Sequence, residues 1–71
     1  GHLMLAAFKS RDGKLVPFTS VTQACKDGSY YMHLLLMGRE RVDSFCFNSV
    51  EDRDQQFANF EKWLTIKTNS I

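Results

Sequence analysis

Two cysteines and one internal histidine are the residues whose chemistry could be catalytic. Cys46 and His33 fall on neighbouring predicted strands, where a thiol and an imidazole could meet across the ladder. A nucleophilic pair also needs a group that orients the base and donors for an oxyanion. No third group is evident, and free cysteine is among the most buried residue types. We therefore predict packed side chains, no catalytic residue, and a non-enzymatic protein without a small-molecule substrate.

The same residues do not have the spacing of a metal site. Cys25, His33 and Cys46 lack paired ligands of the C-x2-C kind. The internal glycines stand singly at predicted turns, so none of them belongs to a phosphate-binding loop. The sequence therefore predicts no metal ion and no cofactor.

Basic residues gather at two predicted turns, which would lie at the same end of a simple meander. These candidate phosphate contacts are Lys9, Arg11, Lys14, Arg39 and Arg41. Three acidic residues offset them, which leaves a surplus of two positive charges, and the whole chain carries only +1. Solvated hairpin tips often have this composition. The alternative is a patch that grips the phosphates of double-stranded DNA.

The elements that position these residues begin with a hairpin. The apolar segment 3–9 predicts a strand, and Asp12-Gly13 predicts a tight turn of the primed type, with the second strand starting near Lys14. Residues 15–25 favour strand through their β-branched side chains. A short helix over 21–27, with Ser20 as its N-cap, is the alternative for this segment. The sequence leaves open whether residues 19–27 are strand or helix.

Residues 30–37 form the clearest predicted strand, because both of its faces are apolar. Residues 42–48 alternate, and we expect Phe45 and Phe47 to face a helix. Alternate side chains of the central strand point to opposite faces of the sheet. One face should then be buried against that helix and the other left free, although the sequence does not settle which face is the free one. The interface candidates are Tyr31, His33, Leu35 and Met37.

A helix is predicted after Ser49, whose hydroxyl suits an N-cap. Phe57, Phe60 and Leu64 recur at helical spacing and would lie on the sheet. We expect the helix to end at 64–66 and residues 67–71 to form a frayed tail.

The expected fold is α+β: an antiparallel meander of three or four strands with one C-terminal helix on one face. At 71 residues there is room for one domain, predicted at 3–66. Gly1-His2 is typical of a tag remnant after protease cleavage. Two cysteines and the lack of a signal peptide or long apolar run predict a cytoplasmic protein that does not enter a membrane. Leu3, if it stands for an alternative start codon, suits a bacterial or phage origin.

One helix can cover only one face of the predicted sheet, while the central strand is apolar on both. An uncovered apolar sheet face in a small domain is typical of an interface. The favoured function is therefore a binding module that contacts a protein partner or a second copy of itself, with double-stranded DNA binding as the alternative.

Residues 31–51 resemble part of the bacterial cell-division activator CedA family of small DNA-binding proteins. The residues that carry the resemblance are Tyr31, Leu36-Met37-Gly38, Ser44, Phe47 and Glu51. The resemblance covers under a third of the chain, and it implies DNA contact through the sheet and its basic turns.

Overall fold

The structure, a computed structural model, describes residues 6–69. The predicted tag remnant and the first residues of the predicted N-terminal strand lie outside this range. The elements in chain order are β1 (Ala7–Lys9), β2 (Leu15–Pro17), a 3-10 turn (Phe18–Ser20), β3 (Val21–Asp27), β4 (Tyr31–Leu36), β5 (Val42–Cys46) and α1 (Val50–Asn69).

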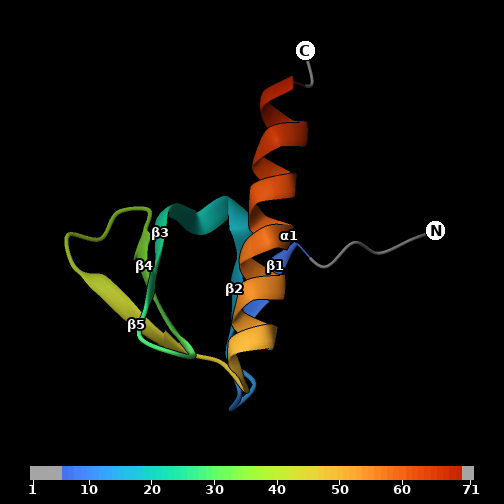
Figure 1. Cartoon of the computed structure of the whole chain (residues 1–71). Coiled ribbons are helices and arrows are strands. Elements are labelled where there is room, and N and C mark those ends of the chain that lie inside the picture. The colour runs from blue at the N-terminus through green and yellow to red at the C-terminus, as the bar shows by residue number, and fades with distance from the viewer. Residues whose placement is uncertain (1–5, 70–71) are drawn as a thin grey trace.

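The strands form two antiparallel sheets, a two-stranded β1–β2 hairpin and a three-stranded β3–β4–β5 meander. In Figure 1 the meander lies on one side of the molecule, and α1 and the hairpin lie together on the other. The predicted α+β class, with an antiparallel meander and one C-terminal helix, is confirmed. The separation of the first hairpin into its own sheet is an addition to that prediction.

The separation takes place at Pro17, which ends β2 and has no N–H to donate to a ladder. The 3-10 turn that follows buries Phe18, whose N–H donates to the Ala6 carbonyl at 2.9 Å. The chain changes direction here, and β3 begins at Val21. The alternative of a short helix over 21–27 is therefore wrong, and the strand favoured by the β-branched residues is confirmed.

The β1–β2 turn is a hairpin turn as predicted, but not of the primed type. Gly13 alone has a positive φ, +88°, while Asp12 does not. The Gly13 N–H donates to the Ser10 carbonyl, and the Ser10 hydroxyl accepts the Lys14 N–H and donates to the Asp12 carboxylate. This is a three-residue loop that needs one left-handed residue, and Gly13 supplies it.

The core lies between the meander and the hairpin-plus-helix side, and it is largely aromatic. Phe8 is fully buried, with its ring centroid 4.9 Å from that of Phe18 and 5.3 Å from that of Phe60. Phe45 and Phe47 are buried as predicted. The other buried apolar residues are Val16, Val21, Met32 and Leu34.

The helix buries a stripe that contains the predicted Phe57 and Phe60 but differs from the prediction in its other members. Its members recur at intervals of three and four and include two polar residues; they are Arg53, Gln56, Phe57, Phe60 and Trp63. Leu64, which the sequence placed on the sheet, is 40% exposed, so that part of the prediction is wrong.

The two polar members bond to backbone atoms of both sheets. The Gln56 side chain accepts the Lys9 N–H at 2.8 Å and donates to the Lys9 carbonyl at 2.9 Å. The Arg53 guanidinium donates to the Gly28 carbonyl at 2.9 Å. The helix is therefore tied to β1 and to the β3–β4 turn by hydrogen bonds from these two side chains.

The helix continues to Asn69, so the predicted end at 64–66 is wrong and residues 67–69 are helical. No glycine or proline follows Leu64 to stop it. The Lys67 ammonium lies 4.9 Å from the centre of the Trp63 ring. Lys67 is in the last turn of the helix, where a positive charge interacts favourably with the helix dipole.

Asp54 joins the helix to β3, with its carboxylate 3.1 Å from the Lys26 ammonium and 3.0 Å from the Arg53 guanidinium. Hydrogen bonds from Lys26 and then Arg53 hold the pKa of Asp54 below its ordinary 3.8. The pKa of Asp54 is lower in the folded state than in the unfolded state. The contact therefore stabilises the fold at pH values above the unfolded-state pKa, and this stabilisation is lost as the pH falls through the folded-state pKa.

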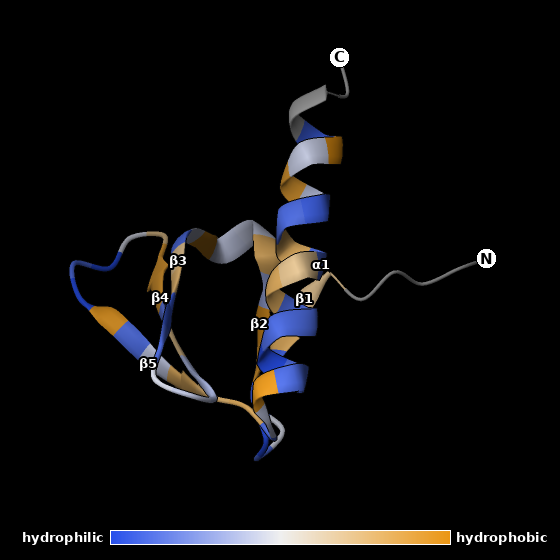
Figure 2. Cartoon of the chain, in the orientation of Figure 1, coloured by the Kyte–Doolittle hydropathy of each residue, from blue (hydrophilic) through white to orange (hydrophobic). Residues whose placement is uncertain are grey.

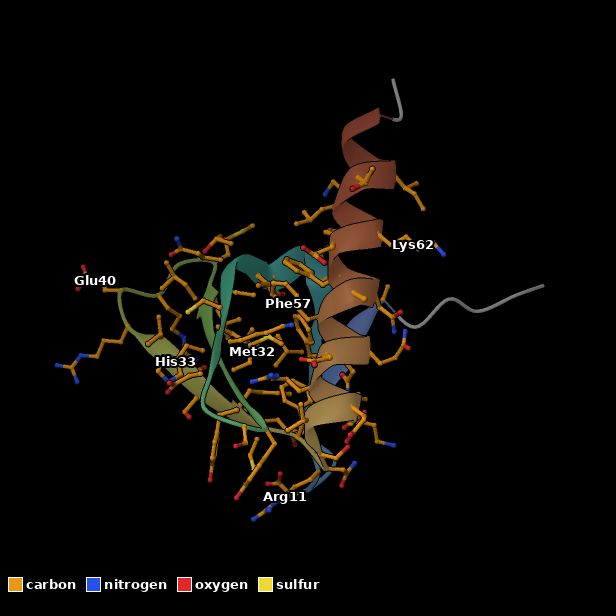
Figure 3. The ribbon with its side chains drawn as sticks, in the orientation of Figure 1. Arg11, Met32, His33, Glu40, Phe57 and Lys62 are labelled. Carbon is orange, nitrogen blue, oxygen red and sulfur yellow. The ribbon has the colours of Figure 1, made fainter. Side chains whose placement is uncertain are left out.

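We expect the Lys26→Met variant to raise the pKa of Asp54 toward its ordinary value, since it removes the first of these bonds. An NMR titration of the Asp54 carboxyl carbon measures this. Lys62→Met is the matched control, because Lys62 points away from the body of the molecule (Figure 3). An equal shift in both variants would mean that general charge, and not the Lys26 contact, lowers the pKa.

Candidate interaction surface

The meander has a second face that points away from the helix, and we call it the outer face. The strand register aligns its residues in three rows across the sheet. The rows are Gln23–Leu35–Val42, Cys25–His33–Ser44 and Asp27–Tyr31–Cys46. Met32 and His33 are neighbours on β4 and point to opposite sides, Met32 toward the helix and His33 away from it (Figure 3).

The strand register and the burial of the β4 side chains show which face of β4 points away from the core. Met32 and Leu34 are fully buried, and Met32 pairs with Phe45. Tyr31 is 38% exposed, and His33 and Leu35 are half-buried. These three interface candidates therefore lie together on the outer face.

The fourth candidate, Met37, lies in the turn directly after β4 and is 68% exposed. Its N–H donates to the Ser20 carbonyl at 2.8 Å, which fixes the backbone at this end of the sheet. On β5, Val42 is 53% exposed beside Leu35. Figure 2 shows that β4 and the start of β5 are hydrophobic, whereas the loop between them is hydrophilic.

A shallow hollow of about 190 Å³ lies in the middle of the outer face, lined by Gln23, Cys25, His33 and Val42. His33 is held at its rim, with Nε2 3.0 Å from the Asp27 carboxylate. This hollow combines apolar carbon with a few polar groups, a composition found in the centres of protein interfaces.

The end of the outer face at Tyr31 carries an aromatic stack. The rings of Tyr30 and Tyr31 are 4.7 Å apart at 26°, and the Arg11 guanidinium lies 6.0 Å from the centre of the Tyr30 ring. A side-chain hydrogen bond with Tyr30, the negative charge of an ionised Tyr30 and that of an ionised Cys46 raise the pKa of Tyr31 above its ordinary 10.0. Tyrosine and arginine are the residue types that dominate binding energy at interfaces.

The five predicted phosphate contacts do not form one patch. Lys9, Arg11 and Lys14 belong to the β1–β2 hairpin, whereas Arg39 and Arg41 lie in the β4–β5 loop. Figure 3 shows Arg11 at the bottom of the molecule and Glu40 well apart from it, at the left-hand tip of the β4–β5 loop. The expectation of a single basic end is therefore wrong, because the turn at Phe18–Ser20 reorients the hairpin relative to the meander.

The candidate nucleophilic pair is not brought together either. Cys46 pairs with Tyr31, and the partners of His33 are Cys25 and Ser44. The Cys25 thiol donates weakly to the Lys26 carbonyl at 3.9 Å. Among residues 6–69, no three His, Cys, Asp or Glu side chains lie close enough together to hold a metal ion. Over the same range, α1 contains no stretch that is long and apolar enough to cross a membrane.

The fold and the surface define a small α+β protein with two antiparallel sheets, a C-terminal helix and a sheet face that residues 6–69 leave uncovered. Comparisons with protein-family models, curated protein sequences and solved structures gave no match.

Three residues of the hollow were not predicted. Cys25 and Gln23 could not be assigned to a face, because the sequence left open whether their segment is strand or helix. Val42 could have been predicted, because in an alternating strand its side chain points to the face opposite that of Phe45.

Proposed function

We propose that this protein is a small interaction module that associates with a second copy of itself through the outer face. The observation that carries the proposal is the outer face of the β3–β4–β5 sheet, which residues 6–69 leave uncovered. It exposes Val42 beside Leu35, and Tyr31 two positions beyond His33 on β4. Apolar side chains aligned on one face of a sheet gain free energy when a second sheet covers them.

The size of the outer face predicts a weak association. Three strands about 4.8 Å apart and roughly 20 Å long give about 300 Å² of flat sheet, below the roughly 800 Å² per partner of a standard interface. We therefore expect a dissociation constant of about 10 µM to 1 mM. Such an association is reversible at the concentrations used for NMR and sedimentation.

The alternative function, double-stranded DNA binding, has less support from the geometry. A DNA-binding surface needs several cations along one face, because phosphate contacts provide most of the affinity. Here the hairpin carries three of the candidate cations and the distant β4–β5 loop carries two. The resemblance to the CedA family is the remaining support for this alternative.

The proposal predicts that Val42→Glu weakens self-association at least tenfold, since it places a carboxylate inside the apolar contact. Sedimentation equilibrium from 10 µM to 1 mM measures the change. The matched control is Ile66→Glu, because Ile66 on α1 is also 53% exposed and the charge change is the same.

A wild-type protein that remains monomeric throughout this range would overturn the proposal. An equal loss of mass in both variants would also overturn it, because general charge would then explain the effect. Amide spectra of both variants at low concentration check that the fold is retained.

A further inference from the structure

The two ends of the outer face differ in charge. At one end Asp27 stands beside Tyr31, and its carboxylate is engaged on one oxygen by His33. The Arg11 guanidinium lies against Tyr30 at the same end and balances the Asp27 charge, so this end carries no net charge. At the other end the β4–β5 loop carries Arg39 and Arg41 on either side of Glu40, a surplus of one positive charge. Figure 3 shows Glu40 at the outer tip of this loop, away from the body of the molecule.

A two-fold axis that brings two outer faces together must lie in the plane between the sheets. If the axis runs along the strands, each basic loop faces its own copy. If it runs across the strands, the basic loop of one copy faces the Asp27 end of the other. Like charges placed opposite each other cost free energy, so the charge pattern favours the second arrangement.

We infer that two copies dock with their β4 strands antiparallel, so that Arg39 and Arg41 of each copy lie over Tyr31 and Asp27 of the other. This inference rests on the proposed function. Residues 31 and 37 are about 20 Å apart along a strand, and an axis midway between them places each over the other. Tyr31 then meets Met37 of the second copy, and sulfur–aromatic contacts of this kind are favourable.

The ring of Tyr31 extends the stack that begins at Arg11 and Tyr30. A guanidinium from the second copy can lie against Tyr31 and still reach the Asp27 carboxylate, which is 60% exposed and directly across the strand pair. Arginine is suited to this position because it stacks on an aromatic ring and bonds a carboxylate at the same time. The contact occurs twice in the dimer by symmetry.

The test reverses the charges at the two ends. We expect Asp27→Lys alone to raise the dissociation constant of the dimer about tenfold at low salt, because two attractive contacts become repulsive. The double variant Arg39→Glu/Arg41→Glu should do the same. The chain that carries all three substitutions should dimerise about as well as the parent, since both contacts are restored with opposite signs.

Sedimentation equilibrium at 20 mM and 500 mM salt distinguishes the outcomes. Three results together would support the antiparallel arrangement. Each set of substitutions weakens dimerisation, the combined chain recovers it, and these differences disappear at high salt. A dimer that Val42→Glu disrupts but the charge reversals leave unchanged would overturn this inference alone. A parent chain that stays monomeric at 1 mM would overturn the proposed function as well.

Discussion

Replacing Phe8 with alanine is expected to lower the free energy of unfolding by about 3–5 kcal/mol. Phe8 is fully buried, and its ring contacts the rings of Phe18, Phe45, Phe47 and Phe60. The substitution removes apolar area and leaves a cavity that four rigid rings cannot fill by small movements. In a domain of this size such a loss approaches the whole stability.

Urea denaturation followed by fluorescence measures this loss as a lower midpoint with an unchanged slope. Leu15→Ala on the neighbouring strand is the control, because Leu15 is 60% exposed and the change should stay within about 0.5 kcal/mol. A loss below about 1 kcal/mol in Phe8→Ala would show that hairpin, meander and helix do not share one core.

The second large effect is expected at Gln56, where the isosteric change Gln56→Glu should destabilise the fold by about 2–4 kcal/mol. The Gln56 amide now donates to the Lys9 carbonyl and to the Asp52 carboxylate, at 2.9 and 3.1 Å. A glutamate would place an oxygen against both acceptors, at a position that is 7% exposed. The shape of the side chain is unchanged, so packing cannot account for the loss.

The adjacent change Gln55→Glu is the matched control, since Gln55 is exposed and bonds only Asn59 among the described residues. Burial and the Asp52 carboxylate would raise the pKa of the introduced glutamate in the folded state. The folded state would then bind the extra proton, so the deficit should grow as the pH rises above about 4.3 and shrink below it. A deficit of equal size in both variants would show that the Lys9 contact carries no stability.

Local rules predicted those parts of the fold in which a few adjacent residues decide the outcome. Ser49 begins the helix as expected: its hydroxyl accepts the Asp52 N–H at 3.0 Å. Asp12-Gly13 marks a hairpin, and the apolar run around Leu34 marks a central strand. The exposed face of that strand could be identified once the pairing of Met32 with Phe45 was known.

The parts that were missed depend on contacts between distant segments. The predicted helix stripe included Leu64 because leucine is apolar. In the structure Arg53 and Gln56 take buried positions instead, through hydrogen bonds to backbone far along the chain. The two basic turns were predicted at the same end because the strands were assumed to form one continuous meander. The turn after Pro17 separates the first hairpin from the meander, so the assumption does not hold. Neither effect leaves a signal in local periodicity or composition.

The hydrogen bonds between Gln56 and Lys9 have a consequence for the biosynthesis of the protein. They occupy the edge of β1 that faces away from β2, and the two residues are 47 positions apart in the chain. The hairpin leaves the ribosome before the helix does, so this edge stays open until α1 has been made. An open strand edge is a template for pairing with another chain. The amide of Gln56 therefore closes this edge of β1 only late in synthesis.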